Sequence, residues 1–375
     1  MASIEDFIPE HIRALAQYIP GKPIRQAERE SGVACIKMSS NENPLGPSPR
    51  AMEAMRRAVA ETNYYPDNDA SDLRLRLAER HGLGAEHVIV ADGSTVLLDL
   101  LARMLLAPGC NAVTSQRSFI VYPIAVRAAG GTLVEVTMRD DAFDLDAVAR
   151  SITRDTRLVF LANPNNPTGT LFDAAATDAF LDRVPDHVLV VLDEAYCDYA
   201  AHYARSRGME YSHSLDYVRQ GRNLIVLRTF SKAHGLAGAR VGYGFGSPRL
   251  VECLARLRTA FSISAVAEAG ALAALDDEAH IRRSLEMNES GVAWLGQQFR
   301  ELGIRSVPTA ANFIYFDVAE DAAALARRLQ AEGVIVRPLT AWGAPTALRV
   351  TVGTPEMNQR FVAALKKVME RAPVR

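Results

Sequence analysis

The sequence predicts an α/β protein with a second, smaller domain, and three observations lead to this prediction. The chain has 375 residues, more than a single hydrophobic core usually organises. Short runs that are apolar on both faces alternate with helical patterns through its middle, which is typical of buried parallel strands covered by helices. Beyond about Glu268 a helix rich in alanine and leucine leads into segments of alternating polarity, which indicates an antiparallel α+β domain.

The N-terminal part of the chain contains a cluster of turn-forming residues from Asn41 to Pro49, which we interpret as a rigid loop after an N-terminal arm. A helix is predicted from near Arg50. A second helix is predicted from Ser71, whose side chain suits a helix N-cap. The predicted organisation is an arm over 1–43, a large domain over 44–270 and a small C-terminal domain over 271–375.

The composition argues against several classes of protein. Charged residues make up 23% of the chain, apolar residues 49%, and the formal net charge is −2, which is typical of a soluble globular protein without a nucleic-acid surface. The longest apolar runs, such as Val188 to Leu192, are far shorter than the roughly 20 residues that cross a bilayer. Because the N-terminus lacks the pattern of a secretory signal, we expect a cytoplasmic location. Four widely spaced cysteines predict neither a disulfide framework nor a metal site.

Polar residues follow each strand that the apolar runs predict. These strands cover residues 87–91, 158–162, 188–192 and 224–227. The segments that come after them are, in chain order, Asp92-Gly93-Ser94-Thr95, the Asn-Pro-rich loop 163–169, Asp193-Glu194-Ala195-Tyr196, and Arg228-Thr229-Phe230-Ser231-Lys232, with Arg240 eight residues further on. Because ligands of open α/β sheets bind at the carboxyl ends of the strands, we predict that these segments form one site.

Each segment by itself has an ordinary structural explanation. Gly93 to Thr95 suit a helix cap, the loop 163–169 suits a turn, and a lone lysine such as Lys232 is usually solvated. Together, however, they are the parts that an organic phosphate with a basic ring nitrogen requires, which is pyridoxal phosphate. An acidic partner keeps the ring nitrogen protonated and makes the ring an electron sink, and Asp193 is predicted to fill this role.

The remaining residues of the predicted site hold the ring and the phosphate. Asn166 and Tyr196 are expected to hydrogen-bond the ring oxygen. The cofactor phosphate and its surroundings are assigned to Gly93, Ser94, Thr95, Thr229, Ser231 and Arg240.

Lys232 is the predicted nucleophile, joined covalently to the cofactor. Its amine must be partly neutral, and we expect Arg240 and the cofactor to lower its pKa. Once released by the amino substrate, the amine becomes the general base that moves a proton between the substrate carbon and the cofactor carbon. Asp193 and Tyr196 complete the predicted catalytic set.

With these motifs the sequence resembles the class I and II aminotransferases of the aspartate aminotransferase fold, and among them the histidinol-phosphate aminotransferase family. The resemblance covers nearly the whole chain. The segments that carry it are Tyr18 to Pro23, Ser40 to Pro49, Tyr65 to Asp67, Asn163 to Gly169, Asp193 to Tyr196, Arg228 to Lys232, Ala311 to Phe313 and Gly333 to Pro338. It implies fold type I of the pyridoxal-phosphate enzymes, in which a mostly parallel, seven-stranded sheet lies between helices and an N-terminal arm and a smaller α+β domain flank it.

The resemblance also implies an activity, which is transfer of the amino group of histidinol phosphate to 2-oxoglutarate in histidine biosynthesis. Tyr122 would stack on the cofactor ring, although an ordinary core aromatic has the same signature. Tyr65 would reach the cofactor phosphate of the neighbouring subunit, which implies a homodimer with shared active sites. Arg349 would grip the anionic end of the substrate, assisted by Arg337, Tyr18 and Asn166.

Three positions depart from the family pattern and leave the substrate more open than the reaction. The phosphate segment Ala91 to Val96 lacks the usual glutamate, Trp342 stands where tyrosine is common, and Ser262 stands where asparagine is common. An aromatic amino acid aminotransferase and a decarboxylase of phosphorylated amino acids use the same lysine and aspartate. A catalytically silent, cofactor-binding regulator is a further alternative, although no segment of the sequence resembles a partner-binding module.

Overall fold

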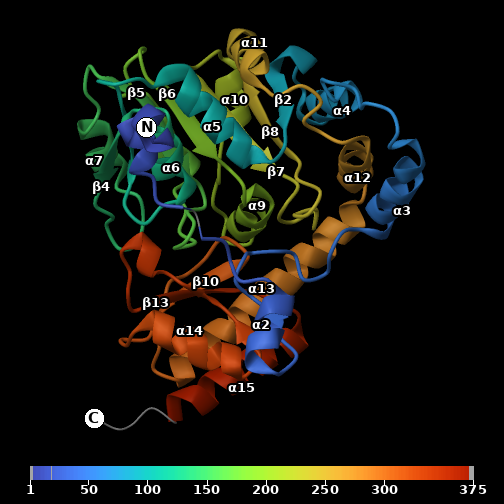
Figure 1. The fold of residues 1–375 in the computed structure, drawn as a ribbon, viewed down its shortest axis with the longest axis vertical. Coiled ribbons are helices and arrows are strands. Elements are labelled where there is room, and N and C mark those ends of the chain that lie inside the picture. Colours follow the sequence, from blue (N-terminus) through green and yellow to red (C-terminus); the bar gives the residue numbers. More distant parts are fainter. Residues whose placement is uncertain (1–2, 18, 371–375) are drawn as a thin grey trace.

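The computed structural model describes residues 3–17 and 19–370, which form a large lobe and a smaller C-terminal lobe (Figure 1). The long helix α13 (Glu278–Glu301) runs from one lobe to the other. This arrangement confirms the predicted α/β fold with a smaller α+β part. Within the described residues, no helix is both long and apolar enough to cross a membrane.

The large lobe is built on a seven-stranded sheet with the order β2-β8-β7-β6-β5-β3-β4. Its strands are β2 (Val88–Ala91), β3 (Asn111–Ser115), β4 (Thr132–Val136), β5 (Thr156–Ala162), β6 (Leu189–Asp193), β7 (Leu224–Thr229) and β8 (Gly242–Gly246). The strands from β7 to β4 pair in parallel, whereas β8 is antiparallel to both of its neighbours. The mostly parallel, seven-stranded sheet is therefore confirmed.

Helices cover both faces of this sheet, which explains why its central strands are apolar throughout. In β7, for example, Val226 packs in the hydrophobic core of one face and Leu227 in that of the other. The helices of the large lobe are α3 (Pro49–Ala58), α4 (Ser71–His81), α5 (Ser94–Leu105), α6 (Val121–Ala128), α7 (Leu145–Arg150), α8 (Ala174–Leu181), α9 (Cys197–Arg205), α10 (Ser214–Arg219), α11 (Pro248–Leu257) and α12 (Ala265–Leu275).

The C-terminal lobe contains an antiparallel sheet with the order β12-β13-β10-β9. Its strands are β9 (Arg305–Ser306), β10 (Phe313–Asp317), β12 (Arg337–Pro338) and β13 (Ala347–Thr351), and its helices besides α13 are α14 (Ala322–Ala331) and α15 (Pro355–Glu370). Phe299 of α13, Phe316 of β10 and Phe361 of α15 meet in its core. Strands β10 and β13 pair antiparallel, in agreement with the antiparallel α+β character predicted for this part of the chain.

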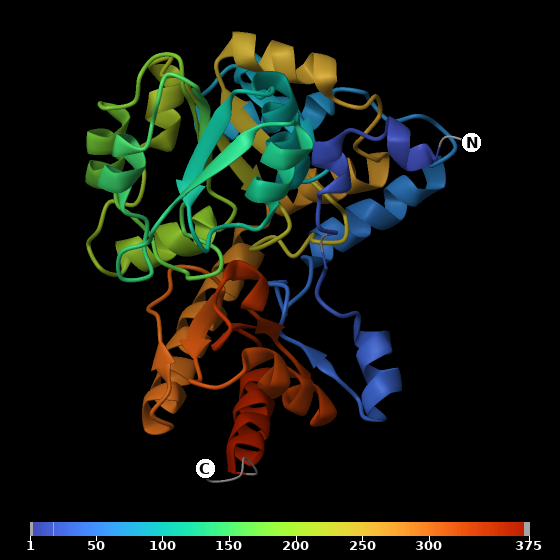
Figure 2. The ribbon, with the colours of Figure 1, turned by 60° about the vertical axis from the view of Figure 1, so that its left-hand side comes forward.

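The N-terminal segment is divided between the two lobes. After the short helix α1 (Glu10–Arg13), helix α2 (Ile24–Ser31) and strand β1 (Ile36–Lys37) lie against the C-terminal lobe, where β1 pairs in parallel with β11 (Val334–Ile335) (Figure 2). Residues that follow β1 then enter the large lobe. This crossing places the segment 38–41 between the lobes, where the site lies.

Two local expectations differ from the structure, and a third, the domain boundary, stays a prediction. Ser71 is the first residue of α4 rather than its N-cap, because Ala70 takes the cap position and the Asp67 carboxylate accepts the Ser71 amide at 2.8 Å. Strands β3 and β4 are not among the predicted strands, since β3 is short of large apolar residues and β4 is a partly exposed edge. The predicted boundary after residue 270 falls inside α12, whose Ala267 and Ala271 share one core, so the domain limits stay predictions.

Candidate active site

A cavity of about 950 Å³, including its open mouth, lies where the two lobes and the N-terminal segment meet. This volume falls within the range of small-molecule sites. Its lining comprises Gly21, Ser39, Ser40, Asn41, Ser94, Thr95, Phe119, Ile120, Ala162, Pro164, Asn166, Asp193, Ala195, Tyr196, Thr229, Ser231, Lys232, Arg240, Arg337, Trp342 and Arg349. The structure thus brings most of the predicted site residues together, although they come from strand ends far apart in sequence.

Lys232 follows β7 and points its amine into a mostly buried environment. Its Nζ donates a hydrogen bond to the Ser40 carbonyl at 3.3 Å and lies 5.4 Å from the centre of the Tyr196 ring. Burial lowers the pKa of Lys232 to about 8, and the guanidinium groups of Arg349 and Arg240 act in the same direction. The predicted contribution of Arg240 is present, but burial and Arg349 are the larger causes. A substantial fraction of this amine is neutral near pH 8, as a nucleophile or general base requires.

Asp193, the last residue of β6, is 4% exposed. Its Oδ2 accepts the hydroxyl of Tyr122 at 2.9 Å, and its Oδ1 accepts the Ala195 amide at 3.3 Å. Burial raises the pKa of Asp193 to about 6, while the hydrogen bond from Tyr122 lowers it. The carboxylate is therefore mostly ionised at neutral pH and is suited to pair with a protonated ring nitrogen.

Tyr122 lies in a different place from the one predicted. Its side chain is fully buried and stacks on Phe160, with ring centroids 4.8 Å apart, so it does not line the cavity. Phe119 lines the cavity instead and contacts Tyr122 edge to face at 5.7 Å. Because α6 begins at Val121, Tyr122 is turned toward the sheet, whereas Phe119 stays in the loop at the cavity wall. Tyr122 instead orients Asp193 through the hydrogen bond to its carboxylate.

Arg349 is only 5% exposed, although its place in an alternating strand would by itself indicate a surface arginine. The large lobe covers this face of β13. Its guanidinium donates to the side-chain oxygen of Asn166 and, at 2.8 Å, to the Ser39 carbonyl. These contacts hold the planar, positively charged guanidinium group of Arg349 at the cavity between the two lobes.

Two site residues from the N-terminal segment are absent from the sequence predictions. Asn41 donates from its amide nitrogen to the Tyr196 hydroxyl at 2.8 Å, and the Ser39 carbonyl orients Arg349. Asn41 has φ 58°, a left-handed conformation that asparagine tolerates better than most residues. The sequence marks the place of both, because Asn41 begins the turn-rich segment 41–49 and Ser39 stands two residues before it, but the pattern assigns neither residue a role in the site.

The predicted phosphate segment lies at the N-terminus of α5, where backbone amides are not paired within the helix. Ser94, Thr95, Ser231 and Arg240 line the cavity here, and Arg240 donates to the Ser231 hydroxyl at 3.2 Å. Gly93 has φ 83°, and a Cβ at this position would lie 2.3 Å from a guanidinium nitrogen of Arg240. An anion fits this arrangement, and the absence of a glutamate side chain leaves the backbone donors in place.

The other predicted substrate and cofactor residues lie at or beyond the cavity edge. Arg337 donates to the Ile19 carbonyl at 2.8 Å, and its guanidinium lies 5.2 Å from the centre of the Trp342 ring. Tyr65 is 83% exposed and does not reach the cavity of its own chain. Tyr18 lies outside the described residues.

The comparison with known families agrees with this geometry. The model of the family described as "Aminotransferase class I and II" matches residues 33–365. A histidinol-phosphate aminotransferase of Pseudomonas aeruginosa is 47% identical over 361 residues, which is 96% of each chain. The chain belongs to the class I and II aminotransferases, in the histidinol-phosphate aminotransferase family.

Two further relatives support the same family and fold for this aminotransferase. A histidinol-phosphate aminotransferase of Moorella thermoacetica is 45% identical over 362 residues, covering 96% of this chain and 92% of that one. The crystal structure of a histidinol-phosphate aminotransferase from Sinorhizobium meliloti in complex with pyridoxal-5'-phosphate has a TM-score of 0.87 at 29% identity and covers 97% of both chains. The predicted family and fold type I are confirmed.

The side chains at the cavity of the aminotransferase fit pyridoxal phosphate. A lysine with a lowered pKa, a buried carboxylate and an anion site at a helix N-terminus face one cavity, which matches the aldehyde, ring nitrogen and phosphate of this cofactor. The cofactor prediction is confirmed at the level of the family.

Replacing Gly93 by alanine is expected to weaken binding of pyridoxal phosphate by about tenfold, since the new methyl group displaces Arg240 and one charge-assisted hydrogen bond to the phosphate is lost. Gly109→Ala is the matched control, because Gly109 also has a positive φ, 90°, but no atom lies within 4 Å of its Cβ position. Spectroscopic titration of the cofactor measures the effect. Equal affinities of the two variants would contradict the proposed phosphate site.

Proposed function

We propose that this aminotransferase transfers the amino group of histidinol phosphate to 2-oxoglutarate and produces imidazole acetol phosphate and glutamate, as a step of histidine biosynthesis. The observation that carries the proposal is the buried guanidinium of Arg349 at the cavity, which Arg337 joins from the same lobe. Two relatives that are 45–47% identical over nearly the whole chain carry the name of this activity.

Pyridoxal phosphate supplies the electron sink that stabilises the carbanion formed beside the substrate nitrogen. Asp193 is assigned to the ring nitrogen, since its buried carboxylate is ionised at neutral pH and is held by Tyr122 and the Ala195 amide. Tyr196 and Asn166 are assigned to the ring oxygen. Asn41 orients the Tyr196 hydroxyl, and Arg349 orients the Asn166 amide through its oxygen.

The proton transfer is assigned to Lys232. In its neutral form the amine accepts the proton from the substrate carbon, and as an ammonium group it donates this proton to the cofactor carbon. Desolvation keeps the two forms close in free energy near pH 8. The phosphate is assigned to the α5 N-terminus with Gly93, Ser94, Thr95, Thr229, Ser231 and Arg240. Lys232 is then not needed to hold the phosphate, and its amine can accept the proton at one carbon and donate it at the other.

Arg349 is assigned to the anionic group of both substrates. A planar fork of donors suits a carboxylate and a phosphate alike, so glutamate and histidinol phosphate can use one arginine in successive half-reactions. Arg337 lies farther toward the cavity mouth, where its contacts with Ile19 and Trp342 fix its position. Tyr18 remains part of the proposed substrate site on the resemblance alone.

The proposed assembly is a homodimer in the cytoplasm. Tyr65 supports it, because this exposed aromatic side chain lies outside the cavity of its own chain and, by resemblance to the family, reaches the cofactor phosphate of a second copy. Each site would then be complete only in the dimer.

The test of the proposed substrate is the ratio of kcat/KM values with 2-oxoglutarate as acceptor. We expect kcat/KM for histidinol phosphate to exceed that for phenylalanine or tyrosine by about a hundredfold or more. A phosphate offers Arg349 and Arg337 more charge and one more acceptor oxygen than the carboxylate of these amino acids, and hydrogen bonds to charged groups contribute about 1.5–3 kcal/mol each. Arg349→Lys should reduce kcat/KM for histidinol phosphate by about tenfold or more, because the bidentate fork is lost. A reversed preference would identify an aromatic aminotransferase, and release of carbon dioxide would identify a decarboxylase.

A further inference from the structure

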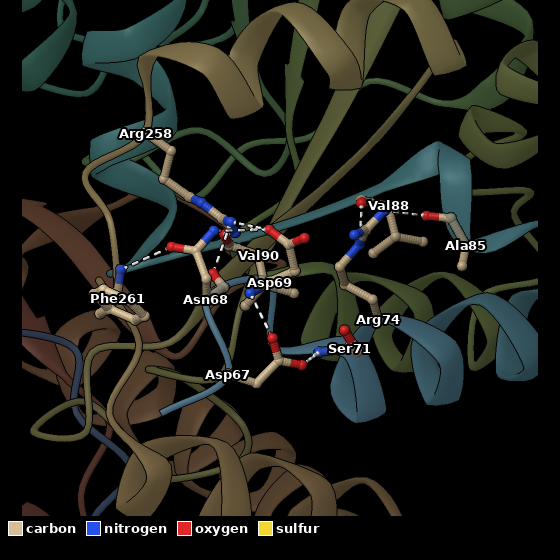
Figure 3. A network of polar contacts seen from close by, with 10 residues as sticks. All are labelled: Asp67, Asn68, Asp69, Ser71, Arg74, Ala85, Val88, Val90, Arg258 and Phe261. Atoms are coloured by element: carbon tan, nitrogen blue, oxygen red, sulfur yellow. Dashed lines mark hydrogen bonds and ion pairs between the residues drawn. The ribbon is translucent and has the colours of Figure 1, made fainter. Parts of the chain in front are cut away.

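Arg258 joins three segments that are remote in sequence (Figure 3). It follows α11, and its side chain is only 4% exposed. One guanidinium nitrogen donates to the Val90 carbonyl of the edge strand β2 at 3.1 Å. The other donates to the Asn68 carbonyl at 2.7 Å and to the Asp69 carboxylate at 2.5 Å. The segment 67–69 is thereby fixed to the strand that leads into the phosphate segment at Gly93.

The same segment is held from two further sides. The Asn68 side-chain oxygen accepts the Phe261 amide at 3.0 Å, and Phe261 has a left-handed φ of 56°. The Asp67 carboxylate accepts the amides of Asp69 at 3.0 Å and Ser71 at 2.8 Å, which closes the turn into α4. The network fixes the backbone of 67–71 and of the loop at Phe261, the two segments that lie next to the exposed side chains of Tyr65 and Phe261.

The segments fixed by this network carry a pair of exposed aromatic side chains, Tyr65 and Phe261. The rings of Tyr65 and Phe261 stack with centroids 4.7 Å apart, although their residues are 83% and 45% exposed. Long, exposed aromatic side chains that are held in one orientation are typical of contact sites rather than of free surface. Neither residue lines the cavity of its own chain, and both are exposed, so the pair is accessible to another molecule.

We propose that Arg258 is a positioning residue, which holds the Tyr65–Phe261 pair so that the Tyr65 hydroxyl reaches the cofactor phosphate in a second copy of the chain. The inference rests on the homodimer of the proposed function. Arg258 touches neither cofactor nor substrate. It acts through Asn68 and Asp69 and, by way of the Asn68 side chain, through the loop at Phe261. Its bond to Val90 ties this pair to the strand that leads into the phosphate segment of its own subunit.

A double-mutant cycle on pyridoxal phosphate affinity tests the proposal. Arg258→Met and Tyr65→Phe should each raise the dissociation constant of the cofactor about tenfold, the effect of losing one charge-assisted hydrogen bond. The double variant should raise it about tenfold as well, not hundredfold, because Arg258 has nothing to position once the hydroxyl is gone. Absorbance titrations measure the constants, and sedimentation velocity gives the mass of each variant.

The controls separate positioning from simple stabilisation. Arg256→Met removes an arginine of α11, two residues before Arg258, whose side chain is 61% exposed and paired with Glu252, and it should leave cofactor affinity unchanged. Asn68→Ala removes the bond to the Phe261 amide and the bond from the Asn68 amide nitrogen to the Asp69 carboxylate at 3.1 Å, but it keeps the backbone carbonyl that Arg258 binds. It should reproduce part of the Arg258→Met effect even if the latter variant does not fold. Multiplicative effects in the cycle, or a lower melting temperature with unchanged affinity, would overturn the proposal. The measured constant does not involve the amino donor, so a wrong substrate assignment would leave this test unaffected.

Discussion

Replacing Lys232 by alanine should reduce kcat with the preferred amino donor by about a thousandfold or more. A positioned general base contributes about 10²–10⁴-fold, and this lysine also supplies the covalent link to the cofactor. The structure favours a large effect, because Lys232 is the one lysine among the cavity-lining residues described and its pKa is lowered to about 8. No neighbouring amine is placed to take over its task. Stopped-flow and steady-state rates at saturating cofactor measure the loss.

A chemical experiment gives an independent check on the same residue. Borohydride reduction of the enzyme with pyridoxal phosphate should fix the cofactor to the peptide that contains Lys232, and mass spectrometry locates the label. Lys366→Ala is a suitable control, since Lys366 is exposed on α15, its amine donates a hydrogen bond to the Gln298 side chain at 3.3 Å, and it is not among the cavity-lining residues. A label on another lysine, or full activity of Lys232→Ala, would refute the assignment.

Replacing Asp193 by asparagine should lower kcat/KM by about 10²–10³-fold, the size of effect seen when one preorganised electrostatic group is removed from an active site. The substitution keeps the shape of the side chain, and the amide oxygen can still accept the Tyr122 hydroxyl. It removes the negative charge that is assigned to the ring nitrogen and, because the amide nitrogen is a donor, the weaker bond that Oδ1 accepts from the Ala195 amide at 3.3 Å. Because the site is buried, water cannot replace that charge.

The comparison of two further variants separates charge from structure at this position. Tyr122→Phe removes the hydrogen bond below Asp193 but not the charge, so its effect should be much smaller than that of Asp193→Asn. Asp182→Asn is the surface control, since the Asp182 side chain is exposed and forms an ion pair with Arg222 at 2.8 Å. If Asp193→Asn kept nearly full kcat/KM with a normal melting temperature, Asp193 would not be the partner of the ring nitrogen.

Much of the candidate site was predictable because local sequence reports it directly. A parallel strand buried on both faces appears as an apolar run, and a ligand site lies at the carboxyl ends of such strands. Asp193 and Lys232 each follow one of these runs, so their convergence required only the direction of the strands. The turn after β2 and the start of α5 followed from the same pattern.

The positions of aromatic and cationic side chains were less accessible to this reasoning. Tyr122 and Phe119 are three residues apart, and only the start of α6 decides which of them faces the cavity. Arg349 alternates with apolar residues in β13 as a surface arginine would, and only the cover of the large lobe buries it. In both cases the deciding neighbour comes from another part of the chain.

The sequence by itself thus determined the fold class, the family and the strand ends that carry the cofactor chemistry, because these depend on hydrophobic patterns and motifs within single segments. Only the tertiary structure placed Asn41 against Tyr196 and Arg258 against Asn68, contacts that join residues 155 and 190 positions apart. Hydrogen bonds of this kind leave no periodicity in the sequence, since each partner is set by how the lobes and loops pack. Local motifs therefore identify the reaction, whereas long-range packing decides where the residues that orient the catalytic side chains lie.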